Sequence, residues 1–119
     1  MLGDRFGSDL LILNGTDSYL QLALENHAGG CITASANLIS PDLRQVWDAF
    51  QRGEDVTQHQ ERIAEIRLVL EKYPPFAPTL KLLLSKLHGF PHWSVRPPLM
   101  QISPQIVEKI TEEFIAVSG

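Results

Sequence analysis

Two short stretches of the chain place small and polar residues where a ligand could come close to the main chain. The first is Asn14–Asp17, which follows the apolar run Leu10–Leu13. The second is AGGCITASAN, Ala28–Asn37, in which two glycines lead into small and β-branched residues. Glycine has no Cβ and lets another group approach the backbone closely. We therefore ask which elements position these two stretches.

The other reactive side chains do not form a recognisable site. The histidines at positions 27, 59, 88 and 92 lack a metal-ligand spacing with acidic partners, so we expect no metal. Cys31 is the single cysteine; it cannot form an intrachain disulfide and is expected to be a small buried strand residue. No secretory signal or apolar run of about 20 residues occurs, which predicts a cytoplasmic protein without a membrane span.

The apolar pattern predicts two strands that alternate with helices, followed by a helical half. Leu10–Leu13 fits a strand buried on both faces, and a helical segment from 18 to 27 follows, with Thr16 or Asp17 as its N-cap. A second strand is expected over 31–36 and a turn over 37–40. Ser40 and Pro41 then begin a helix that Gly53 ends. Further helices are expected over 56–73, from 78 until Gly89, and from 104 through 115.

This order implies parallel strands, and two such strands do not make a stable sheet without neighbours. The chain therefore resembles one part of a larger α/β protein, or it completes its sheet with another chain. Its 119 residues make at most one domain. The net charge of −4 and the lack of a basic stripe argue against a nucleic-acid partner.

Several marks in the chain resemble the C-terminal part of the dihydrodipicolinate synthase/N-acetylneuraminate lyase family. They are Gly15-Thr16-Asp17 after the first strand, Ala28-Gly29-Gly30-x-Ile32-x-x-x-Ala36-Asn37 and Pro41, then Pro78-x-x-Lys81 and Arg96-Pro97-Pro98-Leu99. The resemblance implies the C-terminal portion of a TIM (β/α)8 barrel. Residues 1–53 would be its last two β/α units, and 54–119 its helical C-terminal extension, together one incomplete domain.

Members of that family are class I aldolases that join pyruvate or a related 2-oxo acid to an aldehyde through a lysine imine, without a further cofactor. They usually assemble as homo-oligomers. The imine lysine lies on an earlier strand, whereas the lysines here are all in the helical half, at positions 72, 81, 86 and 109. The chain alone is therefore expected to contribute no catalytic residue and to be inactive.

By this resemblance, Gly15, Thr16, Asp17 and Ile32 would contact substrate. Plain alternatives are a turn glycine at Gly15 and a helix cap at Asp17, and Asn37 is expected to pin a turn. Ala34 stands where sialic-acid lyases have a serine, which weighs against that substrate. Dihydrodipicolinate synthase-like chemistry is the leading hypothesis, with 2-keto-3-deoxy sugar-acid and 4-hydroxy-2-oxoglutarate aldolases open. The alternative is a non-enzymatic half-barrel that pairs with itself or with a separate N-terminal half.

Overall fold

The computed structural model describes residues 2–119, which form two compact units, one ending at Ala64 and the other beginning at Glu65 within helix α4. The elements of the first unit are α1 (Leu2–Phe6), β1 (Leu13–Asn14), a 3-10 helix (Asp17–Tyr19), α2 (Leu20–Glu25), β2 (Gly30–Cys31), α3 (Ala36–Gln51) and the first part of α4 (Thr57–Glu71). Those of the second are the rest of α4, α5 (Phe76–His88), a 3-10 helix (Pro104–Ile106) and α6 (Val107–Ser118).

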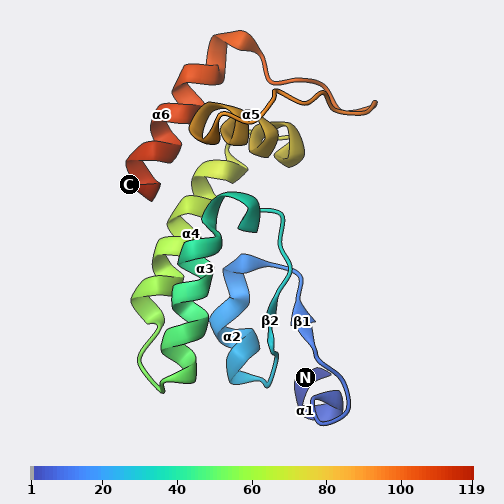
Figure 1. Cartoon of the computed structure of the whole chain (residues 1–119), viewed down its shortest axis with the longest axis vertical. Coiled ribbons are helices and arrows are strands. Elements are labelled where there is room, and N and C mark those ends of the chain that lie inside the picture. Colours follow the sequence, from blue (N-terminus) through green and yellow to red (C-terminus); the bar gives the residue numbers. More distant parts are fainter. Residues whose placement is uncertain (1) are drawn as a thin grey trace. The chain divides into compact units, whose positions relative to one another are not determined.

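The two strands run parallel, as the order of elements predicts. Leu13 pairs with Gly30, and Asn14 pairs with Cys31. Helices α2 and α3 lie on the same side of the strands, with α2 in contact with β2 and with α3 (Figure 1). The indole Nε1 of Trp47, on α3, donates a hydrogen bond of 3.1 Å to the carbonyl of Gly29, which ties that helix to the start of β2.

Both strands are much shorter than the sequence predicts. The expected strand over Leu10–Leu13 is wrong in extent and burial, because β1 begins only at Leu13 and Leu11 is 77% exposed. The expected strand over 31–36 ends at Cys31. A strand that is apolar on both faces needs strands beside it, and within the first unit each strand has one neighbour. Pairing between the two strands therefore ends after two residue pairs.

Helix α3 begins at Ala36, five residues before Pro41, the first helical residue that the Ser40-Pro41 signal indicates. The expected turn over 37–40 is therefore also wrong. The backbone leaves the helical region at Ile39, which has φ −121° and ψ 27°. Pro41 has no N–H to donate to the preceding turn, and its ring crowds the carbonyl four residues before it. The cap-and-proline signal therefore marks the restart of a kinked helix.

Each unit has its own apolar core. The buried apolar residues of the first unit are Leu20, Leu24, Ile39, Leu43, Val46, Ala49, Val56 and Ile63, and those of the second are Ile66, Leu70, Leu80, Leu82, Leu83, Ile110 and Phe114. The predicted helix ends at Gly53 and Gly89 are confirmed. Each glycine follows the last turn of its helix, α3 or α5, and has a positive φ. Within residues 2–119, no helix has the length and apolar character to cross a membrane.

Candidate functional site

The carboxyl ends of β1 and β2 lie next to each other, because the strands are parallel and in register. The amide of Ile32 donates to the carbonyl of Asn14 at 2.9 Å, just beyond the paired residues. The loop after β1 therefore begins beside the loop after β2. This brings together the two stretches that the sequence marks as candidate binding residues.

The side chain of Asn14 shapes the loop after β1. Its Nδ2 donates to the carbonyl of Thr16, and its Oδ1 accepts from the Thr16 amide at 3.4 Å. Gly15 lies at the exposed bend between these residues. Its φ is outside the left-handed region, and an added Cβ would meet no atom within 4 Å. Neither sterics nor backbone conformation within this chain therefore requires glycine at position 15.

A partly buried hydrogen-bond network connects the two loops. The Thr33 hydroxyl donates to Oδ1 of Asp17 at 3.2 Å and lies 2.5 Å from the Ser35 hydroxyl. A hydroxyl has one hydrogen to donate, so Ser35 is the donor to Thr33. Asp17 and Ser35 are both fully buried. These hydrogen bonds link Asp17, the first residue of the 3-10 helix after β1, to the loop that precedes α3.

The four predicted site residues lie on these two loops with different exposures. Gly15 is exposed, Thr16 is half-buried and Asp17 is buried. Ile32, one residue after β2, is 71% exposed. The sequence predicts that Asn37 pins the turn that follows it, but its Nδ2 donates back to the carbonyl of Ala34 at 2.9 Å and so stabilises the turn before helix α3. Thr16 occupies the expected N-cap position, but no side-chain capping hydrogen bond is formed there.

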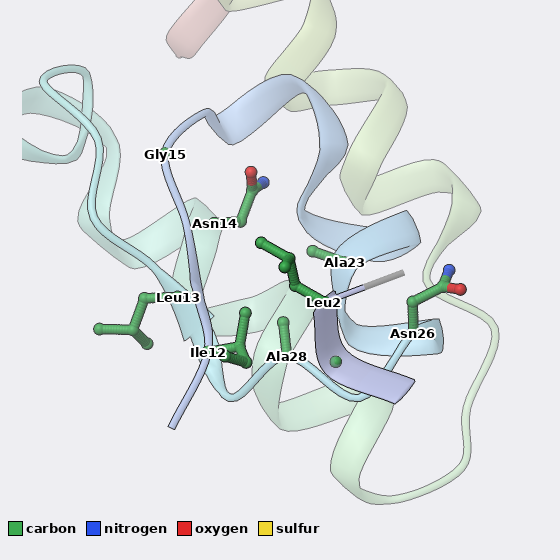
Figure 2. Close-up of a pocket in the computed structure, with 9 residues that line it drawn as sticks. Leu2, Ile12, Leu13, Asn14, Gly15, Ala23, Asn26 and Ala28 are labelled. Carbon is green, nitrogen blue, oxygen red and sulfur yellow. The ribbon is translucent and has the colours of Figure 1, made fainter. Parts of the chain in front are cut away.

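An apolar groove of about 450 Å³ runs along β1 on the side of α1 and α2 (Figure 2). Ile12 and Asn14 point toward Leu2 and Ala23, whereas Leu13 points to the opposite side of the strand. This alternation is that of an extended strand. The groove therefore lies on the face of β1 to which Ile12 and Asn14 belong.

Few titratable groups lie near the strand ends. Burial, followed by the negative charge of Asp17, raises the pKa of the half-buried Cys31 thiol. A raised pKa lowers the thiolate fraction at neutral pH, which disfavours Cys31 as a nucleophile. Residues 2–119 contain no cluster of three His, Cys, Asp or Glu side chains placed to hold a metal ion.

The four lysines all belong to the second unit. Lys72 and Lys86 form ion pairs with Glu113 and Glu108 at 3.2 and 2.9 Å. Lys81 donates to the carbonyl of Ser94 at 2.7 Å. None of these three amines lies at the end of a strand, where the active site of a barrel is found.

Sequence reasoning missed three residues that hold the candidate site together. Thr33 and Ser35 are hydroxyl residues two positions apart just before a helix, where such side chains commonly form local hydrogen bonds, and this could have identified them. Gln60, on α4, contacts the start of α2 from about forty positions away along the chain. No local pattern in the sequence signals that contact.

Comparisons with known proteins identify the family of the chain. The model of the dihydrodipicolinate synthetase family matches residues 2–116. An uncharacterised DapA-like lyase of Chloroflexus aurantiacus is 35% identical over 115 residues, which are 96% of this chain and 38% of that protein. The N-acetylneuraminate lyase of Lactiplantibacillus plantarum is 31% identical over 82% of this chain and 34% of its own length.

The chain also covers only part of the solved structures to which it is similar. The dihydrodipicolinate synthase of Agrobacterium tumefaciens is 28% identical with a TM-score of 0.72, over 97% of this chain and 39% of that one. The chain therefore spans little more than a third of the proteins it matches, and its mostly helical α/β fold aligns to part of their barrel.

Proposed function

Because the chain belongs to the dihydrodipicolinate synthetase family, we propose that it supplies pocket residues to a pyruvate-dependent aldolase that works through a lysine imine. Residues 1–53 are the last two β/α units of the barrel, and 54–119 are its helical extension. The rest of the barrel, on the same polypeptide or another, supplies the lysine. One observation carries the proposal: parallel β1 and β2 place the loops that hold Gly15 and Ile32 side by side.

In the proposed reaction, the lysine amine attacks the carbonyl carbon of pyruvate and water leaves, which forms an imine. Loss of a methyl proton to a general base gives an enamine, whose carbon then bonds to the carbonyl carbon of the aldehyde. Active sites of such barrels lie at the carboxyl ends of the strands. The open space at Gly15 admits substrate, and Ile32 packs beside the 2-oxo acid once the other strands are in place.

In this proposal Thr16 contacts the aldehyde and sets the specificity for it, whereas the buried Asp17 acts indirectly, by fixing the loop that carries Thr16. Thr16 is partly accessible and offers a hydroxyl, whereas the carboxylate of Asp17 is held inward by Thr33. A dihydrodipicolinate synthase-like reaction is the best single assignment. Ala34 is exposed and offers no hydroxyl, which disfavours a sialic-acid substrate; 2-keto-3-deoxy sugar-acid and 4-hydroxy-2-oxoglutarate substrates are further candidates.

The experiment is trapping of the imine with borohydride, read by intact mass. The chain alone, incubated with pyruvate and borohydride, is expected to give no adduct, because its lysines lie in the second unit. A chimera is then made by replacing the matched part of the Lactiplantibacillus plantarum lyase with this chain. It is expected to gain the mass of one reduced pyruvate adduct. A folded chimera without the adduct, or a stoichiometric adduct on the chain alone, would refute the proposal.

A second candidate function is a non-enzymatic half-barrel that self-associates. It is favoured by apolar side chains left uncovered around the strands, Leu10, Leu11 and Ile32. Exposed strand edges and apolar patches drive association with another chain. This function requires that the chain self-associates, which sedimentation velocity of the chain alone tests. A monomer at all concentrations would exclude it.

A further inference from the structure

The start of helix α2 lacks the local cap that its sequence predicts. The first amides of a helix have no acceptor within the helix, and a Ser, Thr, Asp or Asn side chain just before it usually accepts from one of them. Here neither Thr16 nor Tyr19, the residues preceding the 3-10 helix and α2, makes a side-chain capping hydrogen bond. The Asp17 carboxylate accepts from Thr33 instead.

Gln60 of helix α4 supplies the missing cap. Its Oε1 accepts from the amide of Gln21 at 2.9 Å, in the first turn of α2. Its Nε2 donates to the carbonyls of Asp17 and Ser18 at 3.0 and 3.3 Å. One amide side chain therefore contacts three main-chain groups of a five-residue segment. Both ends of the carboxamide are used, as its donor and acceptor atoms allow.

We propose that Gln60 is a positioning residue for the candidate site, which is formed by the loops after β1 and β2. It caps α2 from a distant helix and fixes the backbone from Asp17 to Gln21. Thr16 and Asp17 therefore need not cap this helix start. The Asp17 carboxylate instead accepts a hydrogen bond from Thr33, which connects the two loops. Gln60 thus acts on the site through the main chain of the loop, without touching substrate. Thr33 follows Ile32, which packs beside the 2-oxo acid in the proposed function, so fixing Asp17 also fixes the Ile32 loop. The consequence for pyruvate binding therefore rests on the proposed function, whereas the cap itself does not.

The cap is tested on the chain alone by residue-resolved amide hydrogen exchange. Gln60→Leu removes both the acceptor and the donor while nearly keeping side-chain volume. We expect exchange at the Gln21 amide to become roughly two- to tenfold faster, the range equivalent to losing one net hydrogen bond. Gln58→Leu is the matched control, because Gln58 is an exposed glutamine on the same helix. It should leave exchange at Gln21 unchanged.

A conservative variant separates capping from general stabilisation. Gln60→Glu keeps an acceptor for the Gln21 amide and loses the donor to the Asp17 and Ser18 carbonyls. It should restore protection at Gln21. Unchanged exchange at Gln21 in Gln60→Leu would overturn the cap. So would equal acceleration across α2 and α3, which indicates a loss of global stability.

The consequence for the site is measured in the chimera described above, with pyruvate as the probe. Gln60→Leu should raise the pyruvate concentration for half-maximal imine trapping several-fold and leave the final adduct yield unchanged, whereas Gln58→Leu should change neither. If the pyruvate concentration for half-maximal trapping did not change in Gln60→Leu, the positioning role would be overturned and the proposed function would still stand. A wild-type chimera that traps no pyruvate would refute the proposed function, and the exchange result would still decide the cap.

Discussion

Replacement of Thr33 by valine tests whether the partly buried hydrogen-bond network holds the two loops together. Valine has nearly the shape of threonine, so Thr33→Val removes the hydroxyl without opening a cavity. The hydrogen bond to the Asp17 carboxylate is lost, and the Ser35 hydroxyl loses its buried acceptor. Both partners are fully buried, so water cannot readily replace the missing group.

The expected cost follows from these two losses. A hydrogen bond to a charged group contributes about 1.5–3 kcal/mol, and a buried donor left unsatisfied costs about 1–3 kcal/mol. Because the two contributions share one hydroxyl and are not additive, we expect a loss of about 3 kcal/mol in the free energy of unfolding of the first unit. With a urea slope of about 1.5 kcal/mol/M, the unfolding midpoint falls by about 2 M.

The assay is urea unfolding followed by tryptophan fluorescence. Trp47 reports on the first unit, and Trp93→Phe in every variant removes the signal of the second unit. Thr33→Ser is the matched control, since it keeps the hydroxyl. Ser35→Ala removes only the neutral hydrogen bond and should cost about 1 kcal/mol. A Thr33→Val cost below about 0.5 kcal/mol, or one equal to that of Thr33→Ser, would refute the reasoning.

Two further outcomes are expected of the chain alone. An added Cβ at Gly3 would lie 1.8 Å from the carbonyl oxygen of Asn26, so Gly3→Ala should displace α1 and accelerate amide exchange there, whereas Gly15→Ala should leave exchange and stability unchanged. Accelerated exchange or lost stability in Gly15→Ala would show a structural need for glycine at that bend. Because burial and then Asp17 raise the pKa of Cys31, the thiolate forms at higher pH in the folded chain than in urea. The pH midpoint of iodoacetamide alkylation should therefore lie higher when the chain is folded, and an equal or lower midpoint would contradict this.

Residues close together in sequence were the ones that sequence reasoning placed well. The stops at Gly53 and Gly89 follow from helix ends that require a positive φ, a preference that glycine alone meets without strain. The apolar spacing of α4 was found for the same reason, since Ile63, Ile66 and Leu70 repeat along one helix face and are buried. The parallel pairing of β1 and β2 followed from the order of elements.

Strand length and the contacts of the candidate site depended on neighbours that no local pattern describes. Leu11 belongs to an apolar run typical of a buried strand, yet it is exposed because the ladder beside it stops at two pairs. Asp17 is a suitable helix cap by sequence, but in the folded chain its carboxylate accepts a hydrogen bond from the Thr33 hydroxyl. The amide at Gln21 is capped by Gln60, a contact that only the folded chain reveals.

The sequence by itself therefore determined the family and the parallel β-α-β-α order followed by a helical half, because these depend on residue types and short spacings. It also predicts the two stretches that could meet a substrate. The tertiary structure decided which side chains those stretches leave available. A hydrogen bond is made over about 3 Å between groups that can be forty residues apart, so only the folded chain shows that Asp17 is turned inward and that Gln60 holds its backbone.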